Sequence, residues 1–182
     1  MRRFLLNLAK GCEALNEGVG RLLAWLTLLM VLVTFLVVVL RYAFDLGWIA
    51  MQESITYMHA VLFLGAAAYT LKHQGHVRVD IFYRRFSERT RAWVDLLGTL
   101  LLLFPVCLFI LYIGWAYVAE SWSLLEGSRE AGGLPGVWLL KSMILVMPML
   151  LLVQGVAVIA RALLVLDGAL DRMVSELPEG QE

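Results

Sequence analysis

The chain has 182 residues, of which 61% are hydrophobic and 16% are charged, and its formal net charge is +0. A soluble domain carries about 45–50% apolar and about 25% charged residues. The composition therefore excludes an ordinary soluble domain, a disordered chain and a nucleic-acid-binding protein. It predicts an integral membrane protein.

Four stretches are long and apolar enough to cross a bilayer, whose hydrocarbon core needs about 20 apolar residues in helical form. We predict spans at residues 22–40, 54–72, 94–118 and 137–160. Pro105 and Pro148 lie inside the third and fourth spans and predict kinks there, because neighbouring helices can satisfy the carbonyl groups that proline leaves free. The expected fold class is an all-α integral membrane protein, a four-transmembrane-helix bundle that forms a single membrane domain over residues 1–182.

The basic residues are distributed unevenly over the connections. Twelve lie in the N-terminal segment, the second connection and the tail, whereas the other side of the membrane has three: Arg41, Arg129 and Lys141. Cytoplasmic connections are enriched in Lys and Arg. We therefore expect both termini, the 73–93 connection and the 161–182 tail to be cytoplasmic (N-in/C-in) and the 119–136 connection to be periplasmic, in a bacterial inner membrane.

The N-terminal segment, residues 1–21, has apolar side chains at helical spacing, among them Phe4, Leu8 and Leu15. This pattern predicts either a short amphipathic helix on the cytoplasmic surface or an extension of the first span. The following apolar run begins too late and is too long for a cleaved signal peptide, so we expect the segment to be retained.

The 73–93 connection combines arginines with an apolar face at positions i, i+3, i+4 and i+7, formed by Val79, Phe82, Tyr83 and Phe86. The spacing predicts a short amphipathic interfacial helix, with Arg84 and Arg85 on another face near anionic lipid headgroups. An ordinary basic cytoplasmic loop explains the same arginine content. Arg78 and Asp80, on either side of Val79, are candidates for ion pairs with a partner protein.

The 119–136 connection has the turn signals Gly132-Gly133 and Pro135-Gly136. Trp138 follows it at a position typical of interfacial anchors. Glu126 and Arg129 give the loop charges of both signs. Lys141, one turn inside the fourth span, is expected to pair with a carboxylate, either Glu126 or Glu53 at the start of the second span.

The spans contain few side chains that could bind a cofactor or an ion, or carry out a reaction. A haem b site needs two facing imidazoles, but His59 stands alone in its span, and His73 and His76 follow the same helix. No span has a carboxylate near its centre, as an independent ion-coupled transporter would need. Small residues such as Gly65, Gly114 and Gly155 indicate close helix packing. We therefore expect a membrane scaffold with no metal, no cofactor and no catalytic or substrate-binding residues of its own.

Several short motifs occur in a characteristic order: Leu40-Arg41-Tyr42, Trp48 and Glu53, Gly75-His76-Val77-Arg78-Val79-Asp80, Ser121-Trp122 with Glu126 and Ser128, Gly132-Gly133-Leu134-Pro135, and Trp138 with Lys141-Ser142. With these motifs the chain resembles the small (DctQ-type) membrane subunit of tripartite ATP-independent periplasmic (TRAP) transporters. The resemblance extends over nearly the whole chain. One departure is Met51-Gln52-Glu53, where many relatives are more acidic.

The resemblance implies partners and a role. Small subunits of this type pair with a large (DctM-type) membrane subunit, which carries the substrate and sodium sites and moves like an elevator, and a periplasmic substrate-binding protein delivers an organic acid to the pair. It implies that this chain is a non-catalytic scaffold. On this basis we expect Val79, Phe82, Arg84 and Arg85 to brace the scaffold at the inner surface, and Glu53, Glu126, Arg129 and Lys141 to shape its outer end. A membrane-anchor subunit of a redox complex and a stand-alone four-helix transporter acting as a homodimer are the alternatives.

Overall fold

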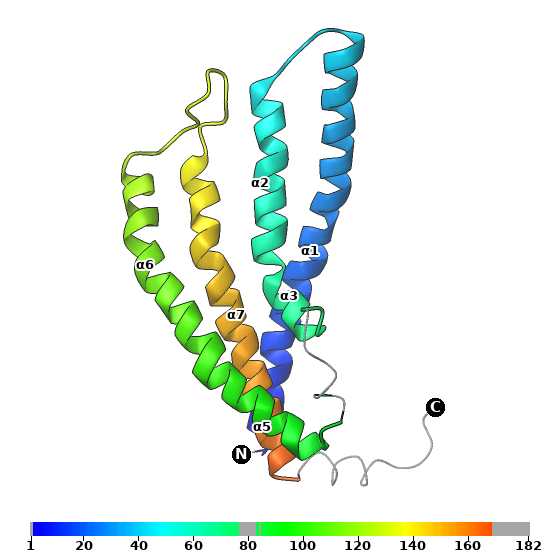
Figure 1. Ribbon diagram of the computed structural model, residues 1–182, viewed down its shortest axis with the longest axis vertical. Helices are drawn as coiled ribbons and strands as arrows, with labels where there is room; N and C mark the ends of the chain where they lie inside the picture. The colour runs from blue at the N-terminus through cyan, green and yellow to red at the C-terminus, as the bar shows by residue number, and fades with distance from the viewer. Residues whose placement is uncertain (1, 77–82, 84, 169–182) are drawn as a thin grey trace.

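The computed structural model describes residues 2–76, 83 and 85–168. In this part of the chain every regular element is helical, and four helical stretches are long and apolar enough to cross a membrane. The predicted all-α fold with four such helices is confirmed. Figure 1 shows the connections 44–48 and 124–136 at one end of the molecule, which we call the loop end. The beginning of the first helix and the end of the last lie at the opposite end, the terminal end.

The first helix, α1 (Arg2–Ala43), is continuous over 42 residues. At 1.5 Å per residue it is about 63 Å long, about twice the thickness of the hydrocarbon core. Residues 2–21 are thus an extension of the first apolar helix, which is the second of the two forms expected for this segment. The apolar side chains Phe4, Leu8 and Leu15 lie on its exposed side, and the buried side is formed by Ala9, Asn16 and Gly20.

The remaining elements are α2 (Ile49–Gly65), α3 (Ala67–Lys72), α5 (Glu88–Gly98), the π-helix η1 (Thr99–Leu103), α6 (Phe104–Ser123) and α7 (Val137–Leu166). Ala66 alone separates α2 from α3, so these two form one stretch across the bundle. Likewise α5, η1 and α6 follow one another without a loop. Ser87 caps α5, because its Oγ accepts a hydrogen bond from the Thr90 amide at 3.2 Å.

The π-helix η1 lies where Pro105 disturbs regular helical hydrogen bonding. Proline has no amide hydrogen and its ring crowds the preceding turn, and wider π-turns are one way in which a helix absorbs such a disturbance. The predicted irregularity of the third span is therefore a local widening just before the proline. Pro148 lies inside α7 and is buried, and the helix continues through it.

Helix α7 is the centre of the bundle, because it contacts every other helical element that the structure describes. In Figure 1 it lies between α6 on one side and the α1–α2 pair on the other. Most of its buried residues are small or lie in its second half, towards the terminal end: Leu145, Pro148, Gln154, Gly155, Ala157, Ala160, Ala162 and Leu164. The core of the molecule is therefore narrow and concentrated near the terminal end.

Glycines set how closely the helices approach. A Cβ atom on Gly20 of α1 would overlap the Tyr69 ring of α3, and one on Gly155 of α7 would overlap the Phe104 ring of α6. Gly65 and Gly114 also face side chains of neighbouring helices, as expected for close packing. Gly98 has open space around it.

Candidate functional site

The loop end is organised around the carboxylate of Glu53, in the first turns of α2. One oxygen accepts a hydrogen bond from the Ser128 hydroxyl, and the other accepts one from the Leu134 amide at 2.7 Å. Within the loop, the Ser128 amide donates to the Leu134 carbonyl at 3.0 Å. A carboxylate that binds a backbone N–H and a hydroxyl together makes charge-assisted bonds, which are stronger than neutral ones. Glu53 thus ties the 124–136 loop to the start of α2.

The close approach of the loop to Glu53 requires a glycine at position 133. A Cβ atom there would meet both the Ser128 Oγ and, at 2.8 Å, the Glu53 Oε2. Gly133 also donates its amide hydrogen to the Glu130 carbonyl at 3.0 Å, which closes a tight turn. The Gly-Gly turn signal in the sequence therefore marks the place where the loop meets α2.

A second cluster joins the end of α6 to the start of α7. Lys141 donates to Glu126 at 2.5 Å, and the buried Ser121 hydroxyl donates to the same carboxylate oxygen at 2.7 Å. The Lys141 ammonium also lies 4.1 Å from the centre of the Tyr117 ring, within range of a cation–π contact. Of the two partners expected for Lys141, Glu126 is thus the one it binds, while Glu53 binds the loop.

The Glu126 carboxylate is held in its charged form. The hydrogen bond from Lys141, and after it the one from Ser121, lowers the pKa of Glu126 below its ordinary value, against a smaller opposing effect of burial. The Arg129 charge acts in the same direction. At neutral pH the carboxylate is therefore ionised and its contacts are fully formed.

Two tryptophans, one on each of the helices joined by this cluster, contact each other. Trp122 of α6 and Trp138 of α7 meet edge to face with ring centres 4.4 Å apart. The Trp122 indole donates to the Ser142 hydroxyl at 2.8 Å, and Ser142 donates to the Trp138 carbonyl at 2.8 Å. Because each ring has an apolar body and a polar edge, the pair suits the boundary between membrane and water.

The loop end also has exposed residues that take no part in these internal contacts. Arg129 and Glu130 are exposed in the loop, and Leu124 and Leu125 are exposed at its start. Leu125 has a φ of 45°, a left-handed conformation that is uncommon for leucine. The loop end is thus a fixed platform with an exposed charge of each sign and two exposed leucines.

The predicted residues of the 73–93 connection fall largely beyond what the structure describes. Arg78, Asp80, Phe82 and Arg84 lie outside the described residues. Arg85 is described and exposed. Nearby, the Tyr83 hydroxyl donates to Asp95 at 2.8 Å, and Arg91 donates to the Tyr83 carbonyl at 3.2 Å.

The sequence reasoning missed the polar contacts between helices at the terminal end. Glu17 of α1 accepts hydrogen bonds from Lys72 at 2.6 Å and His73 at 2.8 Å, and Glu13 pairs with both Nε and Nη2 of Arg161 on α7. Arg21, four residues after Glu17 and bound to it at 2.8 Å, was the one local signal that marked this face. The other partners are far apart in sequence, so no spacing rule links them.

A buried pair adds to this end. The Asn16 Nδ2 donates to the Gln154 Oε1 at 2.9 Å, and both side chains are almost completely buried between α1 and α7. The Asn16 Oδ1 has no hydrogen-bond partner within the described part of the chain. Buried amides normally satisfy each other or an ordered water, so this contact fixes how α1 lies against α7.

No cofactor chemistry emerges from the described residues. Among residues 2–76, 83 and 85–168, no group of three or more His, Cys, Asp or Glu side chains is arranged to bind a metal ion. Several of the described carboxylates bind hydroxyl, amide or basic partners, among them Glu13, Glu17, Glu53, Glu126 and Asp167. What the two ends offer is shape and charge at the membrane surfaces.

Comparison with known proteins identifies the family of this chain. Residues 30–165 match the family model described as "Tripartite ATP-independent periplasmic transporters, DctQ component". No match to the chain was found among curated proteins or among solved structures. The matched region contains Glu53, Glu126 and Lys141 and all of the four apolar helical stretches except residues 2–29 of α1 and Leu166 of α7. The chain therefore belongs to the DctQ family of TRAP transporter components, as its motifs led us to expect.

Proposed function

We propose that this chain is the small permease subunit of a TRAP-type symporter that takes up an organic acid with a sodium gradient. In this proposal it is a non-catalytic scaffold that supports a large DctM-type membrane subunit and helps to dock a periplasmic substrate-binding protein. Family membership supports the transporter role. The observation that carries the docking role is the loop end, where Glu53 and the Glu126–Lys141 pair fix a loop that leaves Arg129 and Glu130 exposed.

In the proposed orientation the loop end is periplasmic and the terminal end cytoplasmic. The bias of twelve basic residues against three supports this choice. So does the grouping of the 44–48 and 124–136 connections at one end of the molecule. Trp138, paired with Trp122, would then anchor the outer boundary of the bilayer.

At the cytoplasmic surface we assign a bracing role to the 73–93 connection. Its basic residues, Arg78, Arg84 and Arg85, suit anionic lipid headgroups or an acidic surface of the large subunit. Asp80 and Phe82 would supply an opposite charge and an apolar contact. The double substitution Arg84→Glu and Arg85→Glu should lower the yield of the complex, and an unchanged yield would argue against this role.

The test of the proposed function is reconstitution. The chain is coexpressed and purified with its large membrane subunit, placed in lipid vesicles, and supplied with the binding protein and a sodium gradient. We expect the two subunits to copurify and organic acid uptake to require both. If the subunits do not copurify, or if the large subunit transports equally well without this chain, the proposal is wrong.

A charge reversal in the loop tests the docking role separately. Arg129→Glu should leave copurification unchanged but raise the concentration of binding protein that gives half-maximal uptake. Arg3→Glu is the matched control, because Arg3 is equally exposed but lies at the terminal end. Equal behaviour of the two variants would remove Arg129 from the docking surface.

A further inference from the structure

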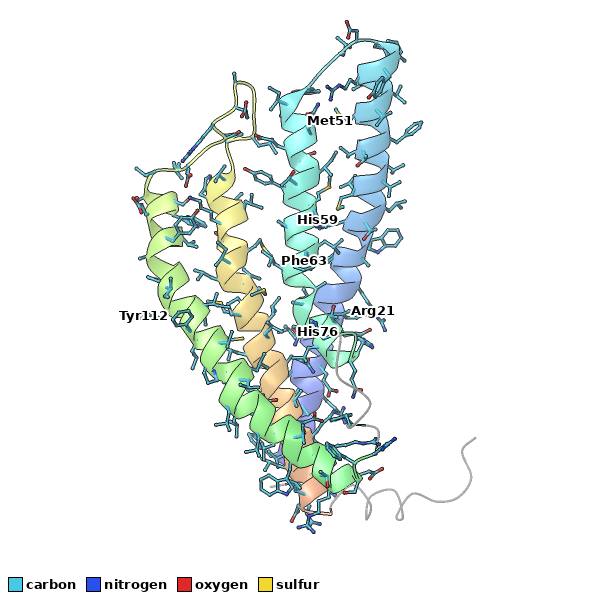
Figure 2. All side chains as sticks on the ribbon, in the orientation of Figure 1. Arg21, Met51, His59, Phe63, His76 and Tyr112 are labelled. Atoms are coloured by element: carbon cyan, nitrogen blue, oxygen red, sulfur yellow. The ribbon has the colours of Figure 1, made fainter. Side chains whose placement is uncertain are left out.

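The exposed side of α2 is unusually polar for a membrane helix. Five residues of α2 are exposed, and their spacing of three or four residues places them on one face: Ile49, Gln52, Thr56, His59 and Phe63. Three of the five have hydrogen-bonding side chains. Figure 2 shows His59 and Phe63 one above the other along α2.

His59 lies near the middle of the membrane-spanning stretch. The stretch runs from Ile49 to Lys72, so at 1.5 Å per residue His59 is about 15 Å from its first residue and about 20 Å from its last. Its ring stacks on Phe63, with centres 6.2 Å apart. The side chains of Gln52, Thr56 and His59 make no hydrogen bond with any described residue.

The other exposed helix faces are different. Between residues 22 and 40, the exposed residues of α1 are aliphatic or aromatic apart from Thr27 and Thr34. Between Pro105 and Tyr117, the exposed residues of α6 are apolar apart from the amphipathic rings of Tyr112, Trp115 and Tyr117, and none is an amide or an imidazole. These faces suit acyl chains, which offer no hydrogen-bond partner. An imidazole at the bilayer centre does not, because polar groups at that depth almost always face protein or water.

We propose that the α2 face formed by Gln52, Thr56, His59 and Phe63 is the contact surface for the large membrane subunit. This inference rests on the proposed function, which supplies such a partner. The occupant is a transmembrane helix of the large subunit that presents a hydrogen-bonding side chain at the depth of His59. Interhelical hydrogen bonds of Gln, Thr and His residues are a common means of joining membrane helices. The exposed apolar faces of α1 and α6 are left to lipid.

Photocrosslinking in the assembled complex tests the surface. The photoreactive residue p-benzoylphenylalanine replaces Phe63, or, as matched aromatic controls, Phe35 of α1 or Tyr112 of α6, in the full chain coexpressed with the large subunit. The three side chains are 70%, 68% and 84% exposed. We expect a covalent adduct with the large subunit from position 63 and none from positions 35 and 112. An adduct from 35 or 112 but not from 63, or an adduct from 63 with a second copy of this chain, overturns the inference.

Substitution of the imidazole gives an independent readout. His59→Leu should weaken retention of the large subunit in detergent by about 3- to 15-fold, the range that interhelical hydrogen bonds in membranes provide. His59→Gln should retain it, because the amide also donates and accepts. Both variants are compared as isolated chains to show that they fold. If His59→Leu retains the large subunit as the wild type does, this inference fails while the proposed function stands; if the wild-type pair itself does not copurify, both fail.

Discussion

The two ends of the bundle differ in how much buried packing of α1 accompanies their polar contacts. At the terminal end, α1 and α7 pack through buried small residues, with Ala9 against Ala157 and Ala160, and the Asn16–Gln154 pair lies in the same contact. Towards the loop end, α1 has no buried residue after Gly20. There two carboxylates, Glu53 and Glu126, bind loop and helix partners. At the terminal end, Glu13 and Glu17 make similar contacts in addition to the packing.

Packing between helices and polar contacts in a loop respond differently to a substitution. Close packing of small residues cannot change without moving whole helices, since protein interiors are densely packed. A hydrogen bond or ion pair at the loop end involves few atoms and contributes about 0.5–1.5 kcal/mol. Losing one of them should therefore disturb the loop and leave the packing of the helices in place.

The largest effect is expected from overpacking the terminal end. Gly20→Val would place side-chain atoms in the space of the Tyr69 ring, and overpacking of this kind costs about 1–3 kcal/mol. We expect a clear fall in the thermal unfolding midpoint of the purified chain. Gly18→Val is the control, because Gly18 lies on the same helix and a Cβ atom there meets nothing within 4 Å. Equal destabilisation by both would show that helix propensity, and not packing, limits α1.

The buried amide pair gives the next largest effect. Asn16→Leu leaves the Gln154 amide buried without its partner, as Gln154→Leu does for Asn16, and each should lower the free energy of unfolding by about 1–3 kcal/mol. The double variant should be less destabilised than the sum of the two, because no unpaired polar group remains. Additive losses in this double-mutant cycle would mean that the two side chains are not coupled.

Most of the fold was predictable because each membrane-spanning helix is a long run of apolar residues in the sequence. Long apolar runs predicted the four long apolar helical stretches of the described residues. The face of α1 that packs was not predictable. The apolar residues Phe4, Leu8 and Leu15 are exposed, whereas Ala9 and Asn16 are buried because they contact α7.

The candidate site was predictable in part. The sequence pointed to Glu53, Glu126 and Lys141, since charges at the ends of apolar runs need partners. The choice between the two carboxylates for Lys141 depended on how the 124–136 loop folds back, which only the three-dimensional structure shows. Contacts between residues more than 100 positions apart, such as Glu13 with Arg161, leave no local pattern.

At the loop end, adding a single methyl group should lower transport without lowering the stability of the fold. Gly133→Ala would push apart Glu53 and Ser128, so we expect uptake by the reconstituted complex to fall about two- to fivefold, the equivalent of one weakened hydrogen bond. The unfolding midpoint should hardly change, because the terminal end is untouched. Gly127→Ala is the control, since a Cβ atom there makes an ordinary contact of 3.5 Å with Pro135. A large loss of thermal stability in Gly133→Ala would show that the loop end, too, is part of the rigid core.

The smallest effect appears only in acid and is followed at the loop end through the Trp122–Trp138 pair. Because contacts to Lys141 and Ser121 lower the pKa of Glu126 from its ordinary value of 4.5, their stabilising contribution is complete above that pH and is lost as the pH falls through the lowered value. Tryptophan fluorescence of the wild type should therefore change below pH 4.5, as the Trp122–Trp138 pair loosens. Glu126→Gln cannot titrate and should show a smaller step, whereas Glu130→Gln should keep the full step. If Glu126→Gln retains the full step, Glu126 does not hold the Trp122–Trp138 pair, and acid acts on another group, such as Glu53, whose pKa is also lowered by its contacts with Ser128 and Leu134.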